Sequence, residues 1–407
     1  MKVPEEWRAT TFGDVADLIS GQHIPASQYS QEPVGIPYLT GPSDFPDGQI
    51  TGSSFTQFPR VVCEPKDVLI TVKGSGVGKI CIADRKYCIS RQLAALRARD
   101  VDASFLYYAV ESMVSELASG ATGFIPGISR GQVLDLGMYL PPRSEQIRIA
   151  EILSGVDEVI QATQSVIEQT RTVKQCVLKR VLAKGIGHSR FKQTEIGEIP
   201  ETWKVRAIGE LGEVNAGRQR SPHFTEGTLR PYLRVANVFD GFIGEGDLLS
   251  MKFTEDEYER YRLKPGDILL NEGQSLELVG RNAVYEGVPA DCCFQNTLVR
   301  FRSGPEVKVG FAYALMQHLF SSGQFMAIAT QTTSVAHLGV KRFANLLVPL
   351  PPQDEQSRIS AIHSQFVQTL NSQTQKHSEL VSLKNALLSD LLTGRKRVTA
   401  DALSPAV

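Results

Sequence analysis

The chain has 407 residues, of which 42% are hydrophobic and 21% charged, a composition typical of a globular protein with room for two domains. Its 43 Lys and Arg side chains nearly balance 44 Asp and Glu, and the net charge of −1 weighs against nucleic-acid binding through bulk charge, leaving only local basic patches. It contains no apolar run of membrane-spanning length, and its opening, MKVPEEWRAT, lacks the apolar core of a signal peptide, so we expect a cytoplasmic protein without a membrane partner.

The first part of the chain, up to residue 140, consists of short β-branched segments punctuated by Gly, Pro and Asp. Segments 68–72 and 79–83 predict strands, and 104–119 predicts a helix. GMYLPP at 137–142 predicts a closing extended segment. Short strands combined with a helix favour an α+β domain with a twisted sheet.

A long helix is predicted from the LPPRSEQ motif at residue 140 to about Gly185. Proline fixes φ and restricts the residue before it, so the two prolines end the extended segment, and Ser144 offers a side-chain oxygen as N-cap. Apolar residues then recur at alternating steps of three and four, which keeps a narrow stripe on one face and requires a partner helix. The stripe comprises Ile149, Ile152, Val156, Val159, Val166, Val173 and Val177, with Thr163 and Thr170 between them.

The same order of features returns in the second half of the chain. The P-x-x-W opening of Pro4 and Trp7 recurs at Pro200 and Trp203, and the LPP motif recurs from Leu350. The early elements match at offsets between 194 and 205 residues, which indicates loops of different length. The strands and the helix of this half are predicted at 267–271, 281–285, 297–301 and 309–322.

The long helix is the part of the repeat that keeps its length. Its two copies match without a gap at an offset of 350 − 140 = 210 residues, with Asp354 as the second N-cap. Gln373 and Lys376 make the middle of the second stripe polar. The obvious partner of each stripe is the other copy. The second stripe comprises Ile359, Ile362, Phe366, Leu380, Leu383, Leu387 and Leu391.

The sequence contains no complete catalytic or metal-binding motif. KGSGVGKI at 73–80 differs from a phosphate-binding G-x-x-x-x-G-K-[ST] loop, because Lys73 and Ile80 replace its first glycine and its hydroxyl residue. The [ND]-P-P-[FY] run of amino-methyltransferases is absent, EPK at 64–66 has no companion acid for a metal nuclease, and no His cluster has zinc-ligand spacing. We therefore expect no catalytic residue, metal or cofactor in this chain. An NTPase built on the glycine loop is an alternative that predicts nucleotide binding abolished by Lys79→Ala.

Polar and basic side chains gather instead in loops that differ between the two halves. Such side chains pair with base edges and phosphates in DNA complexes. Each of them alone is more often a solvated loop residue, so the prediction of DNA contacts depends on the set. The candidates are Lys73, Ser75, Lys79, Arg91, Gln92, Thr122, Ser129, Arg130, Arg218, Arg220, Asn271, Gln274, Arg281, Gln295, Asn296, Thr332, Thr333, His337 and Lys341.

The P-x-x-W opening, the α+β unit, the LPP motif, the E-Q pair and the long helix occur twice over nearly the whole chain. This plan resembles the specificity subunit of type I restriction-modification systems. The resemblance implies two tandem α+β target-recognition domains, each reading one half of a split DNA sequence, and two long helices that form an antiparallel coiled coil between them. It predicts a first recognition domain at 1–140, a first helix at 141–187, a second domain at 188–350, a second helix at 351–397 and a tail at 398–407.

The resemblance also implies that partner subunits carry the chemistry. Two methyltransferase subunits would use S-adenosylmethionine to modify adenine in double-stranded DNA, and restriction subunits would use ATP and Mg²⁺ for cleavage, so this chain itself would bind no cofactor. The alternative from another class is a scaffold whose coiled coil joins partners without reading DNA. It predicts no sequence-selective DNA binding by the assembled complex.

Overall fold

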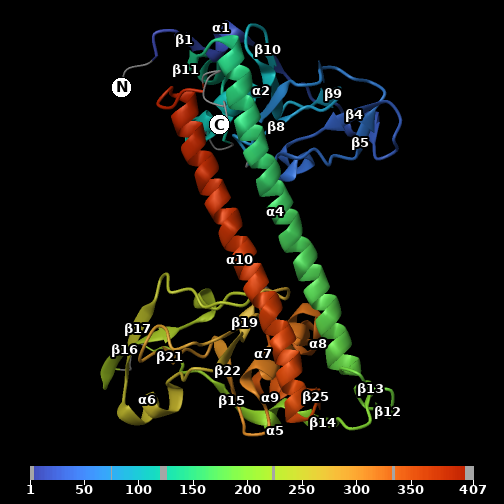
Figure 1. The fold of residues 1–407 in the computed structure, drawn as a ribbon, viewed down its shortest axis with the longest axis vertical. Helices are drawn as coiled ribbons and strands as arrows, with labels where there is room; N and C mark the ends of the chain where they lie inside the picture. The colour runs from blue at the N-terminus through green and yellow to red at the C-terminus, as the bar shows by residue number, and fades with distance from the viewer. Residues whose placement is uncertain (1–3, 75, 120–125, 222–224, 332–334, 399–407) are drawn as a thin grey trace, which may run out of the picture. The chain divides into compact units, whose positions relative to one another are not determined.

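The computed structural model describes residues 4–74, 76–119, 126–221, 225–331 and 335–398. Its contacts divide the chain into unit 1, Met1–Gln164 with Gln375–Val407, and unit 2, Ser165–Thr374. Each of the long helices α4 (Arg143–Lys184) and α10 (Gln353–Leu392) is therefore divided between the two units, with one part in unit 1 and the other in unit 2 (Figure 1). No helix in the described ranges is both long enough and apolar enough to cross a membrane.

Unit 1 is built on a four-stranded antiparallel sheet. Its strands, in spatial order, are β2 (Ala16–Ser20), β10 (Leu93–Ala98), β7 (Val68–Thr71) and β8 (Ile80–Ile82). Helix α2 (Ala103–Ser119) packs on this sheet and buries Phe105, Leu106 and Val110 in the same core as the sheet residues Val68 and Ile70. The strands and the helix predicted in this part of the sequence are thus confirmed.

Short elements complete unit 1 around that sheet. A second sheet has the order β3 (Tyr29–Ser30), β5 (Ser54–Thr56), β4 (Ile36–Leu39), β9 (Tyr87–Ile89) and β6 (Val62–Cys63). The remaining elements are α1 (Phe12–Val15), α3 (Arg130–Leu134) and the antiparallel pair of β1 (Arg8–Thr11) and β11 (Gly137–Leu140). Strand β11 leads directly into α4, so the closing strand positions the start of the long helix.

Unit 2 repeats this plan. Its four-stranded sheet has the order β15 (Gly212–Ala216), β22 (Leu298–Ser303), β18 (Ile268–Asn271) and β20 (Asn282–Val284). Helix α7 (Val309–Ser321) buries Phe311, Leu315 and Leu319 against it. The antiparallel pair of β14 (Lys204–Ala207) and β25 (Leu347–Leu350) leads into α10. The strand order of the two units matches, as expected for a duplicated fold.

The two units differ in the elements between these shared strands. The additional or altered elements of unit 2 are β12 (Phe191–Thr194), β13 (Gly197–Pro200), β16 (Thr228–Leu233), β17 (Leu249–Phe253), β21 (Cys293–Phe294), β19 (Gly273–Gln274), β23 (Thr330–Gln331), β24 (Ala336–His337), α6 (Glu255–Tyr261) and α8 (Gln324–Ile328). In contrast, α5 (Ile208–Leu211) and α9 (Val340–Ala344) match α1 and α3 at offsets of 196 and 210 residues. Strands β17, β16 and β21 form one small sheet, and β19, β24 and β23 form another.

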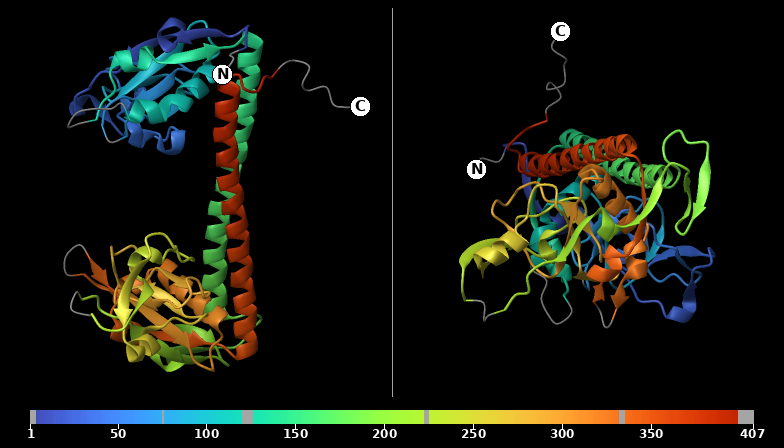
Figure 2. Two further views of the ribbon diagram at one scale, coloured as in Figure 1. Left: turned by 90° about the vertical axis from the view of Figure 1, so that its left-hand side faces the viewer. Right: turned by 90° about the horizontal axis from the view of Figure 1, so that it is seen from below.

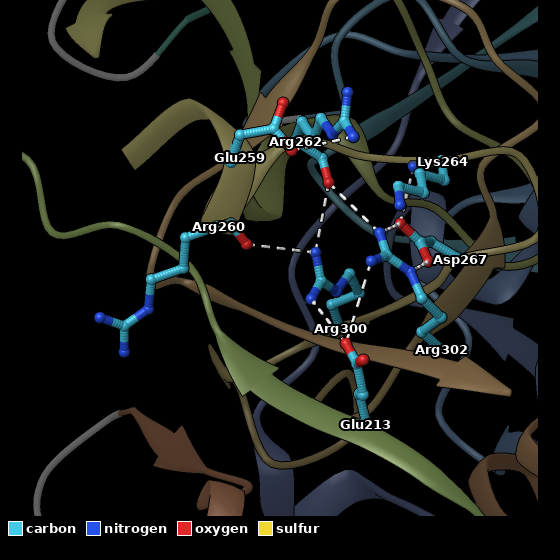
Figure 3. Close-up of polar contacts among 8 residues, drawn as sticks. All are labelled: Glu213, Glu259, Arg260, Arg262, Lys264, Asp267, Arg300 and Arg302. Carbon is cyan, nitrogen blue, oxygen red and sulfur yellow. Dashed lines mark hydrogen bonds and ion pairs between the residues drawn. The ribbon is translucent and has the colours of Figure 1, made fainter. Parts of the chain in front are cut away.

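A buried arginine anchors α6 to the sheet of unit 2 (Figure 3). Arg300 Nη1 donates to the carbonyl oxygens of Arg262 and Arg260 at 3.2 and 3.5 Å, and Nη2 lies 3.5 Å from Glu213 Oε2. Carbonyl groups at the end of a helix lack intrahelical donors, so a cation placed there stabilises the helix. At an offset of 205 residues, the counterpart of Arg300 in unit 1 is Ala95, and the described part of unit 1 contains no helix equivalent to α6 that would need an anchor.

The E-Q pair joins the start of α4 to the rest of unit 1. The indole Nε1 of Trp7 donates to Glu145 Oε2 at 3.0 Å. Gln146 Oε1 accepts from the backbone N–H of Asp102, just before α2, at 2.8 Å. Arg397, which follows α10, donates to the two carboxylate oxygens of Glu145 at 2.8 and 3.0 Å. One glutamate therefore connects the opening tryptophan, the start of α4 and the segment after α10.

Unit 2 makes corresponding contacts, with His188 beside Glu355 where unit 1 has Arg397 beside Glu145. Trp203 Nε1 donates to Glu355 Oε2 at 2.8 Å, and the backbone N–H of Ile186, just after α4, donates to Glu355 Oε1 at 2.8 Å. Gln356 Oε1 accepts from the backbone N–H of Lys308, just before α7, at 2.9 Å. In both units the end of one long helix is thus held at the start of the other, which makes the pair antiparallel (Figure 1, Figure 2).

The inward face of α4 differs from the predicted stripe. Val159, Val166 and Val173 are 44%, 44% and 50% exposed, whereas Leu153 and Ile167 are 0% and 3% exposed. The buried or half-buried positions of the prediction are the residues that recur every seventh position, Ile149, Val156, Thr163, Thr170 and Val177, together with Ile152. The row of residues that faces inward starts at Ile149 and continues in steps of four and then three, whereas the predicted stripe steps by three and then four. Every second residue of the observed row therefore lies one position later in the sequence than predicted, which is a rotation of about 100° around the helix axis.

Helix α10 shows the same displacement. Leu383 is 49% exposed, whereas the side chain of Lys384, one residue later, is only 11% exposed. The other members of the predicted stripe are buried or half-buried: Ile359, Ile362, Phe366, Leu380, Leu387 and Leu391. Each helix therefore carries an inward row and, beside it, exposed apolar positions.

The long helices also begin earlier than their predicted N-caps. Because α4 starts at Arg143 and α10 at Gln353, Ser144 and Asp354 lie inside the first turn. The backbone N–H groups of Glu145 and Gln146 donate to the carbonyl of Pro142 at 2.9 and 3.0 Å. The fixed φ of proline suits the start of a helix, so the second proline of the motif takes the position predicted for Ser144.

Candidate nucleic-acid interface

Four of the predicted DNA-binding residues in unit 1 line one small pocket. Lys73, Arg91, Ser129 and Arg130 surround a cavity of about 300 Å³. Lys73 follows β7 and pairs with Gly127 in an isolated β-bridge, which brings the segment before α3 next to the sheet. The backbone hydrogen bonds that follow the strands therefore assemble residues from three separate loops.

The four residues of this pocket differ in whether their side chains are held by hydrogen bonds within the protein or are exposed to solvent. Ser129 caps α3 by accepting from the backbone N–H of Gln132 at 3.2 Å, and Arg130 Nη1 donates to the carbonyl of Leu18 at 2.7 Å. Lys73 and Arg91 are exposed. We infer that the first two shape the pocket, whereas the two exposed cations are placed to meet an anionic ligand such as a DNA phosphate.

The other candidates in unit 1 lie in the same region of the chain. Lys79 and Gln92 are exposed, and the carbonyl of Gln92 accepts from the backbone N–H of Val72 at 2.8 Å. This bond holds the loop after β9 beside the loop after β7. Ser75 and Thr122 lie outside the described residues.

The corresponding surface of unit 2 has a different chemistry. The repeat offsets of 200, 205 and 210 residues place Gly273, Asn296 and Val340 at the positions of Lys73, Arg91 and Arg130. None of the three replacements carries a charge. The two units therefore differ in charge at these three positions.

Strands β19, β24 and β23 hold the loop candidates of unit 2. His337 pairs with Gly273, and its Nδ1 lies 2.9 Å from Glu272 Oε2 while 45% of its side chain stays exposed. Arg342, which was not predicted, donates to the carbonyls of Ile328 and His337 at 2.8 and 2.7 Å and so fastens both ends of the 328–337 segment. The feature of the sequence that could have identified Arg342 as a candidate is its position next to Lys341, about one helical turn after that segment.

Two candidates of unit 2 are buried and serve the fold. Arg218 is 5% exposed, and its Nη2 lies 2.7 Å from Glu257 Oε1 on α6. Asn271 is 0% exposed and donates to the carbonyl of Val238 at 3.4 Å. The structure therefore does not present either side chain to DNA: β17 and α6 contact Arg218, and Asn271 points toward the backbone of the segment at Val238.

The remaining described candidates of unit 2 have solvent-accessible side chains. Arg281 is half-buried, with its guanidinium carbon 5.0 Å from the centre of the Phe239 ring. Thr332 and Thr333 lie outside the described residues. The other accessible candidates are Arg220, Gln274, Gln295, Asn296 and Lys341. Among the described residues, no group of three or more His, Cys, Asp and Glu is arranged to hold a metal ion.

Comparison with known proteins gives matches over both halves of the chain. The family model of the type I restriction modification DNA specificity domain matches residues 4–170 and again residues 200–381. The chain is 26% identical over 412 residues to the type I restriction enzyme MjaVIII specificity subunit of Methanocaldococcus jannaschii, covering 98% of this chain and 95% of that protein. It is 20% identical over 395 residues to the EcoBI specificity subunit of Escherichia coli, covering 88% of this chain and 79% of that protein.

Solved structures share the fold at low sequence identity. The crystal structure of the type I restriction-modification S subunit from M. genitalium matches with a TM-score of 0.58 and 18% identity, covering 98% of this chain and 99% of that one. A chain from a structural study of complex assembly and conformational transition of the type I system matches with a TM-score of 0.59 and 19% identity, covering 97% and 100%. The fold is thus shared over the whole length of both chains.

Proposed function

Because the chain belongs to the type I restriction-modification DNA specificity family, we propose that it selects the DNA target of a type I complex through two recognition domains. Each domain reads one half of a bipartite sequence, and α4 and α10 set the gap between the halves. The observation that carries this proposal is that one DNA specificity model matches the chain twice, over two units with one strand order. Since the helical repeat is free of gaps while the loops vary, the spacing is kept constant and the reading surfaces differ.

The catalytic work of the complex belongs to other subunits in this proposal. The family supplies sequence specificity. In this proposal two methyltransferase subunits use S-adenosylmethionine, and restriction subunits use ATP and Mg²⁺. The complex acts on double-stranded DNA in the cytoplasm. The partly basic surface described above supports a direct contact of this chain with DNA, which a pure scaffold would not need.

The test of this function is co-expression with the methyltransferase subunits, followed by sequencing of the methylated genome. We expect one split adenine-methylation motif with a fixed gap. Exchanging the loops of unit 1 should change only one half of that motif. A correctly assembled complex that methylates without such a motif would contradict the proposal and favour the scaffold.

Arg91→Ala is expected to weaken DNA binding equally for all sequences and to reduce the slope of log affinity against log salt by about one. The reason is that Arg91 is exposed at the basic pocket, so its loss removes one phosphate contact. Affinity measured over a salt series checks this. Lys86→Ala is the matched control, because Lys86 is also an exposed cation of unit 1 but pairs with Glu64 at 3.0 Å. Equal slopes for the two variants would rule out a phosphate contact at Arg91.

An exposed apolar row on α4 supports the docking of a partner subunit. In unit 2, Val166 and Val173 lie seven residues apart and are 44% and 50% exposed. Apolar residues at heptad spacing are typical of a helix seam, and this row lies outside the inward face that packs within the chain. The position equivalent to Val166 in α10 is Lys376, so α10 lacks this row in its middle.

Replacing both Val166 and Val173 with lysine is expected to weaken the association with methyltransferase subunits about 100-fold or more, since burying each valine contributes about 1.5 kcal/mol or more. Lysine is compatible with the helix because Lys376 occupies the equivalent position of α10. Quantitative pull-down checks this, with Gln169→Lys on the same helix as the control. Undiminished association would place the docking surface elsewhere.

A further inference from the structure

A short turn in unit 2 presents an aromatic ring to solvent. The rings of Phe239 and Phe242 stack with centroids 4.8 Å apart and planes inclined by 7°. Phe242 is 58% exposed, although large aromatic side chains contribute most to stability when they are buried. The guanidinium of Arg281 lies over the Phe239 ring, 5.0 Å from its centroid. The stack thus has a cation at its base and one exposed ring at its end.

Hydrogen bonds hold this turn in place. Val238 and Ile243 form a β-bridge, and the backbone N–H of Phe239 donates to the carbonyl of Phe242 at 3.0 Å. Buried Asn237 donates to the carbonyls of Gly244 and Gly246 at 3.2 and 3.0 Å, which fixes the segment that follows. These hydrogen bonds fix the turn, so the Phe242 ring is held in its exposed position before any ligand binds.

Two of the acidic side chains near the turn, Asp240 and Asp247, are already engaged, whereas Glu245 is exposed. Asp240 Oδ1 accepts from Gln317 Nε2 at 3.0 Å, and the carboxylate of Asp247 forms an ion pair with Arg234. Carboxylates at this place disfavour a contact with DNA phosphates. The ring itself remains the group that can bind a ligand, and a planar apolar face suits another planar ring.

We propose that Phe242 stacks on an exposed base, or between two bases, of the half-site read by unit 2. This inference depends on the proposed function, because it takes DNA as the ligand. Base stacking on aromatic side chains is a recurrent mode of nucleic-acid binding, and apolar side chains inserted at a base step also kink the duplex. A protein partner fits less well, since the chain on both sides of Phe242 is rich in glycine and acidic residues and does not provide the run of apolar residues that an interface needs.

Unit 1 has no aromatic residue at the position that aligns with Phe242, and its exposed Phe58 lies in a different loop, after β5. In the repeat, IPYLTGPSDFPDGQI at 36–50 corresponds to RPYLRVANVFDGFI at 230–243, and this alignment sets Gln49 against Phe242. Phe45, the aromatic residue of the unit 1 turn, is 1% exposed and belongs to the core. The stack is therefore specific to the half-site of unit 2.

The test compares Phe242→Ala and Phe242→Trp in the complex assembled with its methyltransferase subunits. We expect Phe242→Ala to lose about tenfold in affinity for the methylated motif, the effect of one lost base stack, and Phe242→Trp to retain binding. The salt dependence of binding should be unchanged, because no phosphate contact is lost. Leu229→Ala, which removes a 65% exposed apolar side chain of the same unit, is the control and should have no effect.

Duplexes with an abasic position locate the stacked base. At one position of the half-site, removing the base should weaken the unaltered complex but leave the Phe242→Ala complex unchanged. Equal binding by the Phe242→Ala and Leu229→Ala complexes would overturn the inference, as would loss of methyltransferase subunits from the Phe242→Ala complex. If the unaltered complex shows no sequence-selective binding, the proposed function itself fails, so the two failures are distinguishable.

Discussion

Glu355→Ala is expected to lower the free energy of unfolding of the chain by about 3–5 kcal/mol, the usual cost of removing one partner from a buried charged network. The carboxylate, whose side chain is 3% exposed, accepts from Trp203 and from the backbone N–H of Ile186 at 2.8 Å each, and lies 2.9 Å from His188 Nε2. Its loss leaves a fully buried indole N–H without an acceptor. Thermal and denaturant unfolding measure the change, and Glu210→Ala, a 59% exposed carboxylate of unit 2, should stay within about 0.5 kcal/mol of the parent.

The pH dependence gives a second readout of the same site. Burial alone would raise the pKa of Glu355, but hydrogen bonds from Ile186, Trp203 and His188 outweigh it and hold the pKa below its ordinary value of 4.5. A carboxyl group with a lowered folded-state pKa contributes stability that is complete above 4.5 and is lost as the pH falls through the folded-state pKa. The deficit of Glu355→Gln should therefore shrink below about pH 4.5. A deficit independent of pH would show that the charge of Glu355 contributes nothing.

The fold was predictable from the sequence where local signals and the repeat agreed. Segments such as 68–72 and 267–271 are β-branched, punctuated and repeated, and both form central strands of matching sheets. The sequence did not determine which residues of the long helices face each other, because α4 carries apolar residues at both Val166 and Ile167. Both rows satisfy a heptad, and the partner helix decides which of them faces inward.

The candidate site shows the same limit. Lys73 and Arg91 could be chosen as polar loop residues, but their meeting at one pocket depends on strand pairing over long sequence distances. Arg218 looked equally available, yet Glu257 of α6 covers it. Phe242 was missed because polar residues alone were selected, although two phenylalanines flanking Asp-Gly in a turn would have been a usable signal.

Lys384→Met is expected to destabilise the chain, whereas Lys174→Met is not, although the two lysines are equivalent in the helical repeat. Lys384 Nζ lies 2.7 Å from both Glu111 and Asp157 in unit 1, with its side chain 11% exposed. Removing it leaves two neighbouring carboxylates without a cation, at a cost of about 3 kcal/mol. Lys174 in unit 2 donates to the neutral amide of Gln317, at 3.2 Å, and among the described residues it forms no ion pair as short as those of Lys384, although the charge of Asp240 acts on it. Methionine there should leave the free energy of unfolding unchanged or raise it by about 1 kcal/mol.

The pH dependence of both variants follows from the same burial. Burial lowers the pKa of Lys174, so its charged form costs stability below the folded-state pKa, and the gain from methionine should be present at neutral pH. Burial also raises the pKa of Glu111 above 4.5, despite the opposing contact with Lys384. The stability that a raised carboxyl pKa provides is complete below 4.5 and is lost as the pH rises through the folded-state value, so without Lys384 the deficit should be largest at neutral pH and shrink toward pH 4.5. Denaturant unfolding at several pH values measures this, and equal losses at both positions would mean that packing of the lysine stems, and not the carboxylates, decides the outcome.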